Sequence, residues 1–282
     1  MHKLKAHIEN IALHHTIFDL PPAYMGAFLA AGGVPDVWVL LWITLAITGA
    51  RSAALAIDNL VDLKYDKVHP RFTRRPMVTG AVQPWEARLF ILVSLLVCLF
   101  SVYQLPPICL KLLPVAAMPF VVYPFMKRIT FACHAVLGLS IAMAPAGGWV
   151  AVRGTIDFEM IVLCLAVGIW IGAFDAVYGA QDEKFDREHG LHSLATAMGA
   201  AGAMNLAKVF HVVCIGCFVW LGVIMSLSWP YYLGVAIAAV TLVYQHGLLK
   251  PNDFHNLTQM YFMRNGIVSV VMFLCTWVSF YI

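Results

Sequence analysis

The sequence predicts an all-α, polytopic membrane protein, and two observations carry this prediction. Of its 282 residues, 61% are hydrophobic and only 12% are charged, a composition outside the range of soluble globular domains. The apolar residues are also grouped into stretches close to the ~20 residues that an α-helix needs to cross a bilayer. We therefore expect the chain to cross a membrane many times as helices.

Nine stretches qualify as spans, in the order 15–33, 36–57, 85–104, 108–126, 131–152, 158–180, 205–226, 229–247 and 261–281. Proline marks several of their ends, where a break in a helix is tolerated: Pro106 and Pro107 separate the third span from the fourth, and Pro230 lies at the start of the eighth. The N-terminus is mixed polar and the first span runs directly into the second, so no cleavable signal peptide is expected. We expect one transmembrane domain over residues 1–282.

Basic residues indicate the orientation of the bundle. If the N-terminus is cytoplasmic, all but three of the 18 lysines and arginines fall in or beside cytoplasmic segments; the exceptions are Arg51, inside a span, and Lys111 and Arg153 on the opposite side. Such an excess marks the cytoplasmic face. We therefore expect a multi-pass protein of a cell membrane, most simply the bacterial inner membrane, in contact with the lipid bilayer. No basic stretch interleaved with exposed aromatics is present, so no nucleic-acid partner is expected.

Two clusters of acidic residues lie at the cytoplasmic ends of spans and form two pseudo-repeated motifs, at 58–66 and 175–186. Asp58, Asp62 and Asp66 recur every four residues, so they drift only about 80° around a helix and share one face. The second motif has the same property, and its members are Asp175, Tyr178, Asp182 and Asp186. A carboxylate beside hydrocarbon is costly and divalent metal compensates it well. Two such stripes predict two walls of one metal site, in preference to ordinary solvated helix ends.

Basic side chains follow the acidic stripes. Arg71 and Arg75 come after the first stripe, and Lys127 and Arg128 end the fourth span. Magnesium shares carboxylates with substrate phosphates, while cations balance the remaining charge. These residues could therefore clamp a diphosphate. Arg51 lies seven positions before Asp58, about two turns deeper on the same face. There it could bind an acceptor carboxylate, or it could pair with a helix carbonyl or with an acid of its own stripe.

The motifs resemble those of the UbiA superfamily of intramembrane prenyltransferases. Asp58-Asn59-x₂-Asp62-x₃-Asp66, followed by Pro70-Arg71 and Arg75-Pro76, is similar to the first signature, and Asp175-x₂-Tyr178-x₃-Asp182-x₃-Asp186 to the second. The resemblance continues through His15–Phe18, Tyr123-x₃-Lys127 and Lys250–Asp253, and so covers nearly the whole chain. One departure is that Asp58 stands where asparagine is usual. Whether Asp58 or Asn59 contacts metal stays open, although helical phase favours Asp58.

This resemblance implies a nine-helix bundle around a central cavity. It also implies two Mg²⁺ ions held between the motifs and a polyprenyl diphosphate as the prenyl donor. Within the superfamily the chain is most similar to the 4-hydroxybenzoate polyprenyltransferase and MqnP-like branch. That branch prenylates an aromatic acid acceptor, such as 4-hydroxybenzoate or 1,4-dihydroxy-6-naphthoate, for ubiquinone or menaquinone. Two alternatives remain: a relative with a different acceptor (haem, chlorophyllide or a glyceryl phosphate lipid), and an ion-coupled transporter, which also uses acids in membrane helices.

The predicted site residues fall into four groups. The catalytic group is Asp62, Asp66, Asp175, Tyr178, Asp182 and Asp186; the metal ligands are Asp58, Asp62, Asp66, Asp182 and Asp186; the diphosphate partners are Arg71, Arg75, Lys127 and Lys184; the acceptor-binding residues are Arg51, Asn59 and His189. The expected chemistry is loss of diphosphate to give an allyl cation, which the electron-rich aromatic ring attacks. The sequence reveals no dedicated base for the ring proton.

Overall fold

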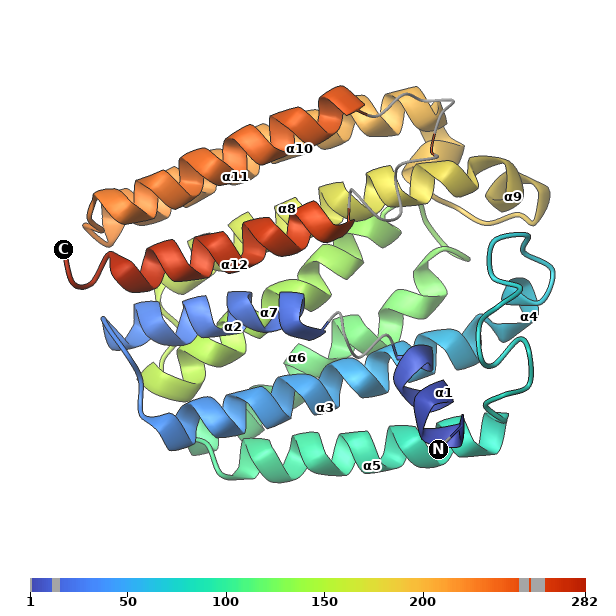
Figure 1. Cartoon of the computed structure of the whole chain (residues 1–282), viewed down its shortest axis with the longest axis horizontal. Coiled ribbons are helices and arrows are strands. Elements are labelled where there is room, and N and C mark those ends of the chain that lie inside the picture. Colours follow the sequence, from blue (N-terminus) through green and yellow to red (C-terminus); the bar gives the residue numbers. More distant parts are fainter. Residues whose placement is uncertain (1, 12–15, 249–253, 255–261) are drawn as a thin grey trace.

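The computed structural model describes residues 2–11, 16–248, 254 and 262–282, and in this part of the chain helices are the only regular elements. His15 and Lys250–Asp253, which contribute to the family resemblance, lie outside the described residues. The helices are α1 (His2–Asn10), α2 (Thr16–Ala31), α3 (Val37–Val61), α4 (Leu63–Asp66), α5 (Pro84–Tyr103), α6 (Pro107–Met126), α7 (Cys133–Arg153), α8 (Phe158–Gly179), the 3₁₀ turn η2 (Ala180–Asp182), α9 (Glu183–Glu188), α10 (Leu194–Ile224), α11 (Trp229–Leu248) and α12 (Phe262–Val278). They form an elongated bundle (Figure 1).

Among the described residues, seven helical segments are long and apolar enough to cross a membrane. They are α3, α5, α6, α7, α8 with its extension to Glu188, α10 and α11. The first and last predicted spans coincide with shorter apolar helices, Leu20–Ala31 within α2 and Met263–Val278 within α12. The all-α membrane bundle predicted from the sequence is confirmed, and the count of nine spans stays a prediction. The seventh predicted span, 205–226, coincides with the later part of α10, which begins at Leu194 and has a kink at Gly199.

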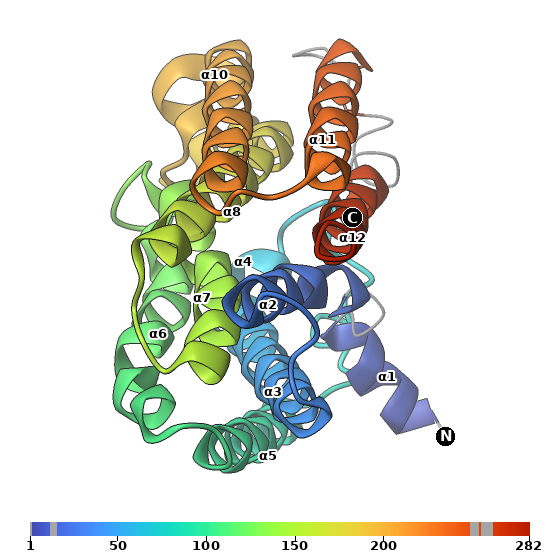
Figure 2. The same cartoon turned by 90° about the vertical axis from the view of Figure 1, so that its left-hand side faces the viewer.

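Small residues allow the central helices to approach closely. In the end-on view α7 lies beside α2, α6 and α8 (Figure 2). A Cβ atom added at Gly138 of α7 would collide with the Gly168 carbonyl of α8, and one at Gly148 would collide with the Ala23 carbonyl of α2. Helices in lipid associate through such close packing, because the surrounding tails are as apolar as the side chains.

Both acidic motifs reach the same end of the bundle, where α4 and α9 lie (Figure 1). The spacing alone predicts one continuous helix for each motif, but both motifs are interrupted. The first continues from α3 into α4 at Asp62, and the second continues from α8 through η2 into α9. The backbone of Asp62 stays near helical values, φ −88° and ψ 0°, and its N–H donates to the Asp58 carbonyl. The acids therefore keep a common side despite the break.

Candidate active site

All six motif acids line one cleft, with a volume of about 160 Å³, at the end of the bundle. Asp58, Asp62 and Asp66 come from the first motif, and Asp175, Asp182 and Asp186 from the second. The cleft also contains Tyr65, His69, Phe72, Arg75, Tyr123, Lys127, Arg128, His134 and Tyr178. Segments more than 100 residues apart in the chain thus form its two walls.

Four acids of the cleft are each held by a basic side chain. Arg128 Nη2 donates to Asp62 Oδ1 at 2.8 Å. Arg75 Nη1 donates to Asp66 Oδ2 at 2.5 Å. Both pairs hold the first wall: Arg75 extends from the loop that follows the first motif, and Arg128 reaches the wall from the short connection after α6.

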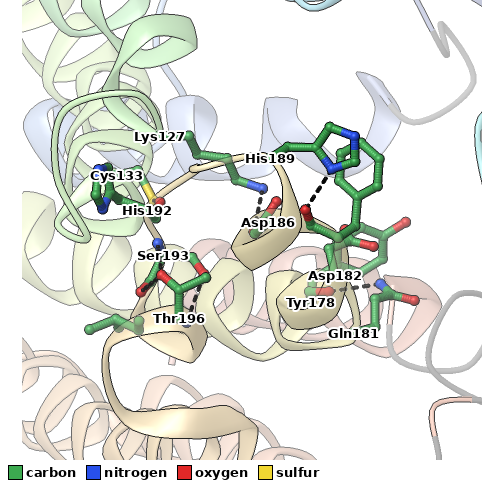
Figure 3. A network of polar contacts seen from close by, with 12 residues as sticks. Lys127, Cys133, Tyr178, Gln181, Asp182, Asp186, His189, His192, Ser193 and Thr196 are labelled. Atoms are coloured by element: carbon green, nitrogen blue, oxygen red, sulfur yellow. Dashed lines mark hydrogen bonds and ion pairs between the residues drawn. The ribbon is translucent and has the colours of Figure 1, made fainter. Parts of the chain in front are cut away.

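The other two pairs hold the acids of the second motif. Arg71, from the loop after the first motif, donates to Asp182 of the second motif and lies 3.2 Å from the Tyr178 hydroxyl. Lys127 Nζ lies 3.6 Å from Asp186 Oδ2 (Figure 3). The His192 N–H donates to the Lys127 carbonyl at 2.6 Å. The loops around the cleft are therefore linked to one another by charge and by backbone hydrogen bonds.

Burial changes the proton affinity of the groups beyond the ends of the spans. It raises the pKa of Asp62 and of Asp66, while Arg128 and Arg75, respectively, oppose that effect. For Lys127, burial acts to lower the pKa, but the carboxylates of Asp186 and Asp175 outweigh it and the pKa is raised. Burial lowers the pKa of His69 despite the nearby Asp182. Lys127 is therefore a permanent cation of the cleft, whereas His69 is neutral at pH 7.

At the inner end of the cleft, Asp175 is held by a histidine instead of a permanent cation. Asp175 Oδ2 lies 2.6 Å from His134 Nδ1, at the start of α7. The Nε2 atom of His134 faces the backbone N–H of Leu194 at 3.4 Å. If Nε2 accepts a hydrogen bond from Leu194, then Nδ1 carries the proton of the ring and donates it to Asp175. His134 is only 3% exposed, so this contact is well shielded.

Three predicted site residues lie outside the cleft, in an adjoining surface hollow of about 340 Å³. Lys184 and His189 line this hollow together with Arg71, and Lys184 is exposed. The His189 ring stacks on Phe185 with centroids 3.9 Å apart, and its Nδ1 lies 2.9 Å from the Phe185 carbonyl (Figure 3). The hollow shares Phe185 and Asp182 with the cleft. It is therefore the outer continuation of the same region.

The remaining predicted acceptor residues, Arg51 and Asn59, are not among the residues that line the cleft. Arg51 Nη1 donates to the Ile11 carbonyl at 3.2 Å, which is the carbonyl pairing considered from the sequence. Asn59 donates to the Asn10 carbonyl at 2.6 Å. Both residues therefore connect α3 to the N-terminal segment.

Sequence reasoning missed His134, His69 and the aromatic residues Tyr65 and Phe72 of the cleft. A lone histidine at the start of an apolar span could have drawn attention to His134. Its partner Asp175 is 41 residues away, however, and only the packing of α7 against α8 brings them together.

The acids of the cleft supply carboxylate oxygens, the type of ligand that Mg²⁺ prefers. Asp186 Oδ2 is buried and makes no hydrogen bond, so a carboxylate oxygen remains for another ligand. Within the described residues, no three acidic, histidine or cysteine side chains are close enough to chelate one ion. Mg²⁺ rarely uses an all-protein cage, because it keeps waters and binds one or two carboxylates together with substrate phosphates. The Asp186 oxygen without a hydrogen bond is a ligand of the kind that Mg²⁺ uses together with substrate phosphates.

Fold and cleft together define a helical membrane protein with a site of paired acids and cations at one end of its bundle. The family model of the UbiA prenyltransferase family matches residues 20–277. The chain therefore belongs to the UbiA prenyltransferase family, and it is an enzyme that transfers prenyl groups, as the sequence predicts.

Curated relatives match over most of their length. A protein named 4-hydroxybenzoate octaprenyltransferase from Methylobacillus flagellatus is 31% identical over 89% of this chain and 84% of its own. A protein of the same name from Cupriavidus metallidurans is 30% identical over 84% of this chain and 81% of its own. The chain is thus similar to bacterial prenyltransferases that are named for an aromatic acid.

Solved structures share the fold. The apo structure of a UbiA homolog from Aeropyrum pernix superimposes with a TM-score of 0.86 at 27% identity and covers 94% of this chain and 98% of that one. A UbiA homolog from Archaeoglobus fulgidus, solved with GPP and Mg²⁺, has a TM-score of 0.76 at 15% identity and covers 98% of this chain and 100% of that one. The second similarity shows the fold alone.

Proposed function

We propose that this chain transfers a polyprenyl group from polyprenyl diphosphate to an aromatic acid, for ubiquinone or menaquinone biosynthesis. The observation that carries the proposal is the cleft in which two acidic walls face each other and basic side chains pair with four of the acids. The relatives named 4-hydroxybenzoate octaprenyltransferase support 4-hydroxybenzoate as acceptor. A 1,4-dihydroxy-6-naphthoate type of acceptor requires the same chemistry.

The charges of the cleft support a diphosphate donor. Two Mg²⁺ ions would be bound by the carboxylates of Asp58, Asp62, Asp66, Asp182 and Asp186. When bound, Mg²⁺ neutralises the charge that develops on the leaving diphosphate. Arg71, Arg75 and Lys127 already border the acids, so each can turn from a carboxylate to a phosphate oxygen over a short distance. Lys184, in the outer hollow, would meet the diphosphate on its cytoplasmic side.

The reaction exchanges one bond for another. The allylic C–O bond of the donor breaks and its electron pair leaves with the diphosphate. The aromatic carbon then forms a C–C bond with the allyl cation, and the ring loses one proton. Asp175 would accept that proton, since it lies seven residues before Asp182, which corresponds to ~10 Å of helix rise towards the interior of the bundle. The reacting allylic carbon of the prenyl group would lie at that depth, whereas the diphosphate would lie nearer the opening of the cleft. Tyr178, one turn after Asp175, would orient the substrates.

The membrane location suits this chemistry. Residues that would face lipid are apolar and exposed on the bundle, such as Leu92, Leu96 and Phe100 of α5. A long isoprenoid tail can therefore lie in the bilayer while the charged group enters the cleft, and water is kept from the cation. The lysines and arginines of the connections near the cleft support a cytoplasmic position for the active site in a bacterial inner membrane.

The test is a competition between acceptors. Purified protein in detergent or liposomes receives a polyprenyl diphosphate, Mg²⁺ and equal amounts of 4-hydroxybenzoate and 1,4-dihydroxy-6-naphthoate, and mass spectrometry identifies the product. We expect one prenylated aromatic acid, formed in step with diphosphate release. Prenylation of haem, chlorophyllide or a glyceryl phosphate lipid, with neither acid modified, would refute the proposed acceptor class. Solute uptake without any prenylated product would refute the proposed reaction.

A further inference from the structure

A chain of hydrogen bonds joins the N-terminal helix α1 to an acid of the cleft. The amide of Asn59 donates from Nδ2 to the Asn10 carbonyl, at 2.6 Å, and its Oδ1 accepts from Arg75 Nη1, at 3.3 Å. The same Nη1 donates to Asp66 Oδ2 at 2.5 Å. One side chain, Asn59, therefore connects the end of α1 to the guanidinium that holds Asp66.

The end of α1 is a natural acceptor for these donors. The last carbonyls of a helix have no partner within it and carry the negative end of its dipole. Two side chains of α3 supply donors there: Asn59 to the Asn10 carbonyl and Arg51 to the Ile11 carbonyl. Asn10 and Ile11 are buried, at 8% and 3% exposure, so water competes little with these bonds. The C-terminal end of α1 is thereby fixed to α3.

The middle of α1 packs on the loop that carries Arg75. Ala6 is buried in a small apolar cluster with Met77, Val82 and Ala87. Met77 and Val82 belong to the segment between α4 and α5, directly after Arg75. The helix α1 therefore contacts both the residue that binds Arg75 and the loop from which Arg75 extends.

Arg75 needs such support because it is long and lies partly in the open cleft. Its side chain is 34% exposed, whereas that of its partner Asp66 is 6% exposed. The guanidinium lies 3.7 Å from the centroid of the Phe72 ring, which restrains one face. Asn59 restrains one edge with a neutral oxygen. If Asp66 turns to a metal ion, Asn59 and Phe72 still hold the guanidinium in place.

We propose that Asn59 is a positioning residue and that α1 is its support: together they hold the Arg75 guanidinium where the donor diphosphate arrives. The inference rests on the diphosphate site of the proposed function. Asn59 is not among the residues that line the cleft, so it acts through Arg75 and touches neither substrate. Its role then differs from the acceptor contact that the sequence predicts.

Binding measurements on Asn59→Leu test this role. Calorimetry with a prenyl thiolodiphosphate, a donor analogue that does not react, gives the diphosphate affinity in the presence of Mg²⁺. We expect binding about tenfold weaker than in the wild type, the effect of one lost hydrogen bond to a charged group. The KM for the aromatic acid should stay within twofold. Removal of residues 2–10 should produce the same loss, and the combined variant should bind no more weakly than either change alone.

Lys3→Ala is the matched control on the same helix. Lys3 pairs with Glu86 at 2.7 Å, but its side chain is 61% exposed and it has no contact with Asn59 in the described structure. An exposed ion pair contributes little, so the affinity for the analogue should be unchanged. Asn59→Ala serves as a second variant should the bulkier leucine prevent folding, and thermal melting of each purified protein identifies that case.

Three results would overturn the inference. A higher KM for the aromatic acid, with unchanged analogue binding, would make Asn59 an acceptor ligand. Additive losses would mean that α1 and Asn59 act independently, and unchanged binding in both variants would mean that neither supports Arg75. The titration contains no acceptor, so it tests donor binding alone. If the wild type binds the analogue but prenylates neither aromatic acid, the proposed acceptor is wrong and the inference about Asn59 is unaffected.

Discussion

Asp182→Asn is the change that tests the cleft most directly. The substitution preserves the shape of the side chain and removes its charge. Asp182 is 9% exposed in its side chain, accepts a hydrogen bond from Arg71 and lies 3.3 Å from His69 Nε2. If Asp182 holds Mg²⁺ against the leaving diphosphate, its loss should slow prenyl transfer by about 10³-fold. That corresponds to ~4 kcal/mol, comparable to removal of one group that stabilises transition-state charge.

The same change should affect stability far less. Breaking a fully buried ion pair costs ~3–5 kcal/mol. Arg71 is 27% exposed in its side chain and can turn to solvent, so we expect a cost of about 1 kcal/mol. For a chain of this size that corresponds to a fall in Tm of about 2 °C. The expected loss of rate is therefore much larger than the loss of stability, so a slow Asp182→Asn enzyme cannot be explained by unfolding.

The assay is diphosphate release in a single turnover with excess enzyme, followed at a temperature well below the Tm. Glu188→Gln is the control, because it removes the same charge from an exposed residue that lines the outer hollow and not the cleft. That variant should keep its rate within about twofold, since an exposed charge contributes little. An Asp182→Asn enzyme whose rate stays within tenfold of the wild type would refute the metal-ligand role of this acid.

Three further outcomes are expected. Chelation of divalent ions with EDTA should abolish prenyl transfer and added Mg²⁺ should restore it; full activity in excess chelator would contradict a metal-dependent reaction. His134→Ala should lower kcat by about 10–100-fold, since Asp175 loses its hydrogen-bond donor. The affinity for the prenyl diphosphate analogue should stay near that of the wild type. A change in that affinity alone would argue against a role of His134 in supporting Asp175. Gly138→Ala should reduce stability by ~1–3 kcal/mol, because the new methyl group meets the Gly168 carbonyl of α8; Gly147→Ala, in open space on the same helix, should leave the Tm unchanged or higher.

Composition and helical period determine much of this protein from the sequence. Apolar stretches of bilayer length fix the all-α membrane bundle, because a helix of that length crosses the bilayer and satisfies all its backbone hydrogen bonds internally. Several predicted spans agree closely with helices: 158–180 with α8 and 229–247 with α11. The spacing of Asp58, Asp62 and Asp66 also predicts a shared face, and these acids do line one cleft. These features are local, so the order of residues suffices.

The partners of these acids depend on tertiary structure. The sequence suggests that Arg71 lies near the first motif, yet it crosses to Asp182, 111 residues away. Asn59 lies within the first motif and Arg51 lies seven residues before it, but each turns to the end of α1. Helical phase gives the direction in which a side chain leaves its own helix and does not identify the neighbouring element. Contacts between distant segments arise only when the helices pack, and they decide which residues bind substrate and which hold other residues in place.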